Sequence, residues 1–375
     1  MVAFPHHHIP GAAVIVYHMY KQYAGGAYTV PVILESVMSD AMHKFYGFAK
    51  DILCCPACGG DLKISQAHLN CAGCGAGYGI SGGIPLFFCK HNFRTPGNSI
   101  TDAVREFYET NPFPNYSDLE DAAGLIERAK EGLFAGLLDE QIPPGARILE
   151  AGCGTGQLSN FLGIANRTVF GADLSISSLK LAQGFKEKNS LDNVHFLQMN
   201  LFRPAFRPKS FDLVICNGVL HHTPDPSAGF EAIAGLVKDG GYVIMGLYHK
   251  YGRIPHEIRR LIFKLSGRRL DRITPRNRVV DTVKRRAWIM DQYANPHESK
   301  HTIREALSWF RRTGFEFIRS IPGPGLFKKI FINEKLFMPE RLPDSAVLFL
   351  SELAMVFTGS ADGGLFLIIG RRGRV

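Results

Sequence analysis

Short apolar runs alternate with polar or amphipathic stretches from residue 147 onward. Runs at 147–151, 168–172, 194–200, 211–217 and 241–248 are each separated from the next by a helical stretch or a short loop. Strands that alternate with helices predict a doubly wound parallel sheet whose functional site lies at the carboxyl ends of the strands. With 375 residues, the chain has room for two or three domains.

A glycine-rich loop follows the first of these runs. Gly152, Gly154 and Gly156 come directly before a helical segment, where free backbone N–H groups can hold a closely approaching ligand. Dinucleotide-binding loops have the spacing Gly-x-Gly-x-x-Gly, but Gln157 stands three residues after Gly154, which disfavours a nicotinamide cofactor. The second run ends in Asp173, whose carboxylate could bind a ribose diol or cap the following helix.

Four of the eight cysteines have the spacing of a metal site. Two Cys-x2-Cys pairs are separated by 12 residues, and four thiolates would complete a closed, structural zinc shell. Two disulfides are the alternative, which a reducing compartment disfavours. Residues 52–87 resemble the small zinc-ribbon family that includes the tRNA methyltransferase activator subunit. The predicted ligands are Cys55, Cys58, Cys71 and Cys74, with Cys54 outside the set.

The segment from His297 to His301 matches the His-Glu-x-x-His pattern of zinc proteases. That chemistry needs both histidines one turn apart on a helix. Pro296 precedes the motif, and Thr302 with Glu305 predicts a capping box that starts a helix only after the second histidine. We therefore place the motif in a loop and do not expect a protease.

The segment that begins at the glycine loop resembles the class I S-adenosylmethionine-dependent methyltransferases. Four motifs occur in order at the family's spacing: Glu150-x-Gly152-x-Gly154-x-Gly156, Asp173, the segment 196–202, and Phe211-Asp212-Leu213-Val214 leading to Asn217. The resemblance implies S-adenosylmethionine as cofactor and a Rossmann-like, seven-stranded, mostly parallel sheet with helices on both faces. Strands at 315–320 and 365–370 would complete that sheet, the last one antiparallel.

The resemblance also assigns roles to individual residues. Glu150 and the loop glycines would cradle the amino-acid part of the cofactor, Asp173 would bind the ribose hydroxyls, and Asn217 would lie near the sulfonium. Asn200 stands where the family commonly has Asp, but its amide oxygen can still accept from the adenine amino group. The expected cofactor-binding set is Glu150, Gly152, Gly154, Gly156, Asp173, Leu174, Asn200, Leu201 and Asn217.

Methyl transfer mainly requires alignment and, for hydroxyl, amine or acidic carbon acceptors, removal of a proton. His221 and His222 follow the fourth strand at the mouth of the expected site and are candidate catalytic bases, because an imidazole suits proton removal near neutral pH. Packing or solvent exposure is the alternative role for both. Tyr108, Phe113 and Tyr116 could close the site from its N-terminal side.

Positive charge is concentrated in one part of the chain. Residues 250–290 contain 13 Lys or Arg and three acidic residues, a local excess of ten, whereas the whole chain has a net charge of +9. Five apolar residues recur there at helical spacing among basic ones and predict a basic amphipathic helix. The helix could cover the catalytic core, lie on an anionic membrane, clamp an acidic substrate or contact RNA. The apolar residues are Ile254, Ile258, Leu261, Ile262 and Leu265, flanked by Arg259, Arg260 and Lys264.

No apolar stretch approaches the roughly 20 residues that a transmembrane helix needs. We expect a cytoplasmic protein, with membrane-surface or RNA contact through the basic segment as an option. The expected divisions are an unassigned extension (1–45), a zinc ribbon (46–92), a helical linker or cap (93–145), a cofactor-binding core (146–249), a basic helical insertion (250–312) and the final strands of the core (313–375).

Three functions are compatible with these features. The leading hypothesis is methylation of a small-molecule or lipid-like acceptor, because the loop after the fourth strand looks like those of quinone, lipid and natural-product methyltransferases. The Asn/Asp-Pro-Pro-Tyr pattern of many methyltransferases of nucleic-acid amino groups is absent from that loop. A zinc-ribbon rRNA or tRNA methyltransferase is the alternative, since a ribbon before such a core also resembles the bacterial rRNA guanine methyltransferases. The third hypothesis is a non-catalytic, cofactor-binding scaffold that regulates a partner.

Overall fold

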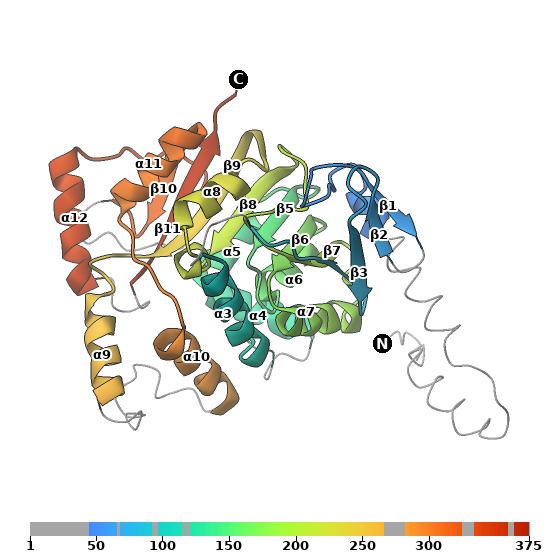
Figure 1. Ribbon diagram of the computed structural model, residues 1–375. Helices are drawn as coiled ribbons and strands as arrows, with labels where there is room; N and C mark the ends of the chain where they lie inside the picture. The colour runs from blue at the N-terminus through green and yellow to red at the C-terminus, as the bar shows by residue number, and fades with distance from the viewer. Residues whose placement is uncertain are drawn as a thin grey trace, which may run out of the picture.

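The computed structural model describes residues 45–65, 68–91, 97–114, 116, 121–265, 282–324, 334–358 and 364–374. Within these residues the strands form one 11-stranded sheet, with helices on both of its faces (Figure 1). The strand order is β1-β2-β3-β4-β7-β6-β5-β8-β9-β11-β10. The predicted N-terminal extension up to residue 44, and residues 266–281 of the basic segment, lie outside the described residues.

The central part of this sheet is the predicted Rossmann-like sheet. Strands β7, β6, β5, β8 and β9 are parallel, and β11 runs antiparallel between β9 and β10. All six residues of β7 are buried, as expected for a strand that helices cover on both faces. The seven-stranded, mostly parallel sheet is therefore confirmed. Its strands are β5 (Arg147–Ala151), β6 (Thr168–Asp173), β7 (Val194–Met199), β8 (Phe211–Asn217), β9 (Val237–Tyr248), β10 (Phe315–Ile321) and β11 (Leu365–Arg372).

Two groups of helices cover the faces of the sheet. On one face, α4 (Ala122–Glu131), α5 (Leu133–Gln141) and α6 (Gln157–Ile164) bury their apolar side chains against β5 and β8, and α7 (Ile176–Lys188) lies beside α6. On the other face, α8 (Pro226–Ala234) and α11 (Ile303–Thr313) meet through a cluster of aromatic rings. This cluster contains Phe230, Trp309, Phe310 and Phe315. Helix α11 thus belongs to the core, although the sequence placed most of it in the basic insertion.

The cysteine-containing ribbon is continuous with the core. Its strands β1 (Leu62–Ser65), β2 (His68–Cys71), β3 (Gly77–Ser81) and β4 (Ile84–Phe87) pair antiparallel in sequence order. Strand β4 then pairs parallel with β7, so the ribbon extends the sheet at its edge. Residues just before β1 also join the core, since Leu53 is buried in the same cluster as Phe206 and Phe211. The sequence predicted the ribbon but not this shared core.

The remaining helices lie around the carboxyl edge of the sheet and at the end opposite the ribbon (Figure 1). They are α3 (Gly97–Thr110), the 3-10 turn η1 (Leu220–His222), α9 (Ile254–Leu265), α10 (Thr282–Ala294) and α12 (Ser345–Thr358). In the part of the chain that the structure describes, no helix is long and apolar enough to cross a membrane. The idea that α9 covers the core with its apolar side is wrong, because Ile258 and Leu261 are 56% and 58% exposed.

Because the ribbon and the central sheet share one hydrophobic core, we expect them to unfold together. Leu53→Ala should lower the free energy of unfolding of the whole molecule by about 2–4 kcal/mol, because it removes a fully packed side chain at the ribbon–core boundary. The measurement is urea unfolding in a Trp288→Phe background, in which Trp309 reports from the far side of the core. Lys63→Ala, at an exposed ribbon position, is the control. An unchanged Trp309 transition would show that the ribbon unfolds independently.

Candidate functional site

A cavity of about 530 Å³ lies at the carboxyl ends of the central strands. Asp173, Asn200 and Asn217 follow or end β6, β7 and β8, and the glycine loop follows β5. These residues meet because parallel strands that begin on one side of a sheet all end on the other. The rest of the wall is mostly apolar, and the volume suits a ligand of small-molecule size. Apolar lining residues include Val104, Phe113, Leu125, Phe161, Met199 and Val219.

The glycine loop is packed so closely that none of its three glycines has room for a side chain. A Cβ on Gly152 would lie 2.3 Å from a methyl carbon of Val219, and one on Gly154 would lie 2.5 Å from the carbonyl oxygen of Phe113. Both glycines have positive φ and line the cavity. Gly156 does not line the cavity; it starts α6 and packs against the ring of Phe196. The loop therefore presents bare backbone to the cavity.

Asp173 ties the glycine loop to the next strand. Its Oδ2 accepts a hydrogen bond from the Gly154 N–H (2.8 Å), and its Oδ1 accepts from the Ser175 N–H (2.8 Å). Burial is the main reason that the pKa of Asp173 is raised, and these backbone donors oppose the shift. Asp173 is not the cap of the following helix. Ser175 caps α7, because its hydroxyl accepts a hydrogen bond from the Ser178 N–H.

Glu150 lies at the end of β5, below the glycine loop. Its carboxylate is buried, lines the cavity and accepts a hydrogen bond from the Ser159 hydroxyl. The pKa of Glu150 is raised to about 7. Burial is the main cause, the Ser159 hydrogen bonds oppose it, and the charge of Asp173 adds a smaller upward contribution. Among the described residues no cation forms an ion pair with it, so the site holds an acid that a cationic ligand would ionise.

The other predicted cofactor residues also reach the cavity. Leu174 and Leu201 line it, and Asn217 is exposed into it. The side chain of Asn200 lines it too but already holds local structure, because its Nδ2 donates to the Cys89 carbonyl (2.9 Å) and its Oδ1 accepts from the Phe202 N–H (3.2 Å). Asn200 thus connects the exit of the ribbon to the cavity floor, a role that the sequence did not indicate.

The two candidate bases have different positions. His222 lines the cavity, and its Nδ1 donates to the carbonyl oxygen of His297 (2.7 Å). Because a carbonyl only accepts, Nδ1 carries the proton, and neutral His222 keeps a lone pair on Nε2. Burial is the main cause that lowers the pKa of His222, so the ring is neutral near pH 7. His221 does not line the cavity; its ring is fully buried against Tyr248, at 3.9 Å between centroids.

Of the three aromatic residues expected to close the cavity from the segment before the core, two lie at it. Tyr108 and Phe113 line it, and the Thr155 hydroxyl donates to the Pro114 carbonyl. Tyr116 instead packs outside, where its ring stacks on Phe185 at 4.5 Å. The carboxylate of Glu109 on α3 accepts from the Ile176 and Ser177 N–H groups at 2.7 and 2.9 Å. Although burial alone would raise the pKa of Glu109, these donors at the start of α7 lower it.

A buried polar network on the far wall was not predicted. Arg253 is fully buried, and its guanidinium binds both carboxylate oxygens of Glu298 (3.0 and 2.8 Å) and Gln292 Oε1 (2.8 Å). Gln292 in turn donates to Tyr248 and Asp291, at 2.8 and 2.9 Å. Asp291 and Gln292 line the cavity. The only sequence signal was the set of charged residues themselves, since their partners lie up to 45 positions apart.

Glu298 belongs to the segment that matches the zinc-protease pattern, and the structure confirms that the segment is a loop. Residues 295–301 are not helical, and α11 starts after Thr302, whose hydroxyl accepts from the Glu305 N–H. His297 holds His222 through its carbonyl rather than its ring. The motif therefore supplies an ion-pair partner and a backbone acceptor.

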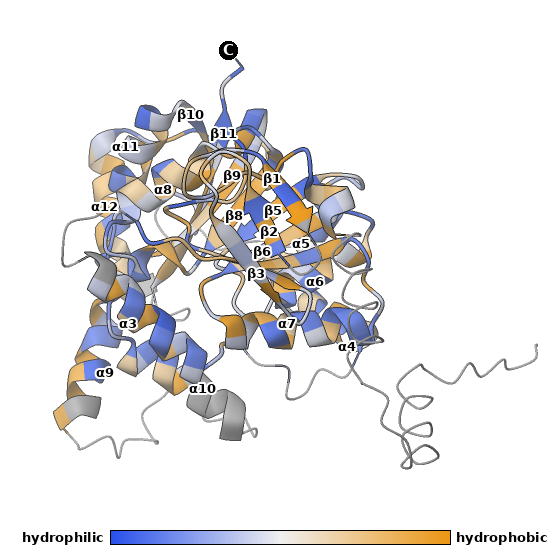
Figure 2. Cartoon of the chain, turned by 45° about the vertical axis from the view of Figure 1, so that its right-hand side comes forward, coloured by the Kyte–Doolittle hydropathy of each residue, from blue (hydrophilic) through white to orange (hydrophobic). Residues whose placement is uncertain are grey.

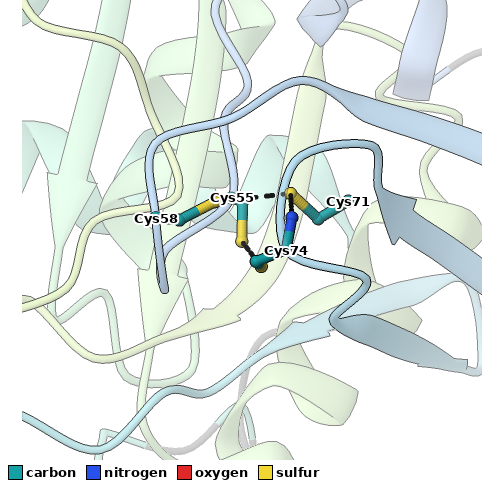
Figure 3. Close-up of side chains that lie close together, drawn as sticks. All are labelled: Cys55, Cys58, Cys71 and Cys74. Carbon is teal, nitrogen blue, oxygen red and sulfur yellow. Dashed lines mark hydrogen bonds between the residues drawn. The ribbon is translucent and has the colours of Figure 1, made fainter.

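The four predicted metal ligands converge at one point in the ribbon (Figure 3). Their sulfur atoms all lie within 4.8 Å of one another, with 3.7 Å between Cys55 and Cys74 and 3.4 Å between Cys58 and Cys71. These distances exclude disulfides in this structure, since bonded sulfurs are about 2.05 Å apart. The Gly60 and Gly73 N–H groups point at Cys58 and Cys71 sulfurs (3.4 and 3.3 Å). Cys54 is buried outside the cluster, as expected.

Comparison with known proteins agrees with the geometry of the cavity. Residues 149–245 match a family model described as a methyltransferase domain. The chain contains a methyltransferase domain. This domain includes every predicted cofactor residue and both histidines, whereas the ribbon, the α3 cap and the helices α9 to α12 lie outside the match.

Relatives of the methyltransferase domain cover only part of the chain. An uncharacterized protein of Synechococcus sp. is 27% identical over 258 residues, which are 60% of this chain and 61% of the relative. A ubiquinone biosynthesis O-methyltransferase of Paracidovorax citrulli is 35% identical over 32% of this chain and 50% of the relative. The magnesium protoporphyrin IX methyltransferase of Synechocystis PCC 6803 superimposes with a TM-score of 0.43 at 18% identity, over 73% of this chain and all of that chain. The chain thus spans about half to three fifths of the length of these two curated relatives.

Proposed function

We propose that this protein is an S-adenosylmethionine-dependent methyltransferase that methylates a hydroxyl group of a small, lipid-like acceptor. The observation that carries the proposal is one apolar cavity lined by the glycine loop, Glu150, Asp173 and His222. The proton of His222 is on Nδ1, which leaves Nε2 able to accept a proton. The apolar wall favours an apolar acceptor over a polyanionic one such as RNA. The name of the ubiquinone biosynthesis relative, an O-methyltransferase, supports a hydroxyl acceptor.

The cofactor residues fit S-adenosylmethionine on structural grounds. Bare backbone at Gly152 and Gly154 allows close approach, and the ionisable Glu150 below the loop would accept an ammonium group. Asp173 retains lone pairs for a ribose diol beyond the two that its backbone donors use. When bound, the cofactor supplies an electrophilic methyl group. His222 Nε2 would take the proton of the acceptor hydroxyl, and the hydrogen-bonded pair of Tyr108 and Asp291 would shape the wall beside it.

Asp173 provides the first test. Asp173→Ala should weaken S-adenosylmethionine binding at least about 100-fold, because it removes the ribose acceptor and releases the Gly154 N–H. Titration calorimetry measures the affinity, and circular dichroism checks that the variant is folded. Asp192→Ala, on a loop away from the cavity, is the matched control. Retained affinity in Asp173→Ala would remove the cofactor assignment.

Glu150 predicts a pH dependence of cofactor affinity. Its pKa of about 7 means that, between pH 7.5 and pH 6.0, the carboxyl becomes mostly protonated in the free protein, and binding an ammonium group must then release that proton. The dissociation constant of S-adenosylmethionine should therefore rise roughly tenfold as pH falls across this range. Glu150→Gln should bind more weakly at pH 7.5 and show little pH dependence. An equally steep dependence in Glu150→Gln would assign the titration to another group.

His222 predicts a change in rate without a change in cofactor affinity. His222→Asn keeps a donor for the His297 carbonyl but has no basic lone pair, so kcat should fall about 10²–10⁴-fold. The measurement is the initial rate of label transfer from methyl-labelled cofactor to an acceptor fraction, beside calorimetry with the cofactor. His221→Phe, which fills the buried site beside Tyr248, should keep kcat within a few-fold. If His221→Phe loses the rate and His222→Asn keeps it, the assignment of the base is wrong.

The cysteine cluster fits a structural zinc ion. Four thiolates about 2.3 Å from a zinc ion would lie about 3.8 Å apart, close to the spacing seen here. We expect one zinc ion per chain by elemental analysis, lost in Cys74→Ser, whose side chain is exposed and leaves no cavity in the core. Cys89→Ser, outside the cluster, should keep the metal. Metal-free wild-type protein with all thiols reactive would contradict the zinc site.

A further inference from the structure

Helix α9 is oriented with its charged side inward and its apolar side outward. Arg253, just before the helix, and His256 are 0% and 3% exposed, and Arg260 contacts Glu298. Arg253 lies over the ring of Tyr248 at 3.6 Å, and His256 Nε2 bonds to the Gln292 carbonyl at 3.1 Å. Polar contacts therefore attach this helix to the protein. The apolar side is left to solvent, where Ile254, Ile258, Leu261, Ile262 and Leu265 are 38–78% exposed.

A second exposed apolar stripe lies at the same end of the molecule. On α12, Val347, Leu350 and Phe357 are 38%, 54% and 84% exposed and recur at helical spacing. The backbone of α12 at Met355 packs beside Gly252, which precedes α9, so the end of one helix adjoins the start of the other. Figures 1 and 2 place α12 directly above α9, and Figure 2 shows hydrophobic residues on α9 beside hydrophilic ones. We call these eight exposed side chains of α9 and α12 the α9–α12 face.

We propose that the α9–α12 face docks the protein on an anionic lipid bilayer. Exposed aliphatic and aromatic side chains beside positive charge are the features that hold a helix at a membrane interface. The sequence supplies this charge, since α9 and the chain that follows it, to residue 290, contain 11 Lys or Arg and three acidic residues, an excess of eight positive charges. The proposal goes beyond methyl transfer, since it concerns a surface outside the cavity.

Two other occupants fit this face less well. In a symmetric pair, a second copy would bring two basic segments of the same sign together. A nucleic acid would match the charge but not the aliphatic side chains, because bases stack on aromatic or guanidinium planes. A bilayer matches both the charge and the apolar surface.

The position of the α9–α12 face is consistent with delivery of a lipid-like acceptor. Arg253, just before α9, bonds to Gln292 on α10, and Gln292 lines the cavity. The docking helix and the cavity thus share one polar wall. Docking would hold the cavity close to the bilayer from which an apolar acceptor enters.

The test is co-sedimentation of the full chain with vesicles at about 0.1 M salt, where exposed charges are screened beyond about 10 Å. Vesicles of phosphatidylcholine alone are compared with vesicles that also contain about 30% phosphatidylglycerol. Ile258→Glu/Leu261→Glu removes apolar contacts, and Leu181→Glu on α7 is the control, because Leu181 is an exposed leucine (42%) away from this face. Calorimetry with S-adenosylmethionine checks that each variant keeps its fold and its cavity.

We expect the wild type to bind the anionic vesicles at least about tenfold more strongly than the neutral ones. The double variant should bind them at least about tenfold more weakly than the wild type, whereas Leu181→Glu should bind like the wild type. Wild-type protein that stays in the supernatant, or a double variant that binds equally, overturns the proposal. So does a wild-type dimer, seen by sedimentation velocity, that the double variant converts to monomer without any vesicle binding. Loss of cofactor binding alone would count against the proposed function and not against docking.

Discussion

The contact between Asp173 and the glycine loop is the constraint on which the cavity depends. One carboxylate accepts from the Gly154 N–H on one loop and the Ser175 N–H on the next, so it joins the carboxyl ends of β5 and β6. With the loop fixed there, only glycine fits at 152 and 154, because Val219 lies too close to the first position and the Phe113 carbonyl too close to the second. Phe113 belongs to the segment after α3, so the same contact also determines where the cap closes.

The wall of the cavity formed by the insertion is held by buried polar interactions. The insertion is attached by a buried ion pair between Arg253 and Glu298, with Gln292 and Tyr248 as neutral partners. Removing one partner of such a pair leaves a buried charge and costs about 3–5 kcal/mol, so the pair specifies geometry more than it adds stability. Because the polar side of α9 is used for attachment, its apolar side is available for another surface. One side of α9 thus attaches the helix to the protein, and the opposite side is the one that we propose docks on a membrane.

The sequence predicted the features that depend on local pattern. Apolar runs predicted five of the seven strands and the family resemblance supplied the last two. The shared carboxyl edge then brought Glu150, Asp173, Asn200 and Asn217 to one cavity. The Thr302 cap correctly kept the His-Glu-x-x-His segment out of a helix. Cysteine spacing predicted the convergence of four thiols, since both pairs lie on tight turns whose geometry is local.

Features that depend on distant partners could not be predicted in this way. Nothing in a pair of adjacent histidines says which one faces the cavity; the His297 carbonyl, 75 positions away, decides this for His222. The inward charge of α9 depends on Glu298, and the pairing of β4 with β7 depends on residues more than 100 positions apart. An amphipathic pattern shows that a helix has two sides, but only the tertiary structure shows which side is buried.

The most direct test of the central claim is label transfer from methyl-labelled S-adenosylmethionine by the purified protein in a cell extract, with separate recovery of RNA, protein and organic-soluble fractions. An apolar cavity with a neutral His222 predicts label in the organic-soluble fraction. The label should be in a methyl ether, which is stable to base, rather than in a methyl ester, which base would hydrolyse to labelled methanol. Label in RNA would contradict the proposed acceptor. Tight binding of the cofactor with no label in any fraction would contradict catalysis itself.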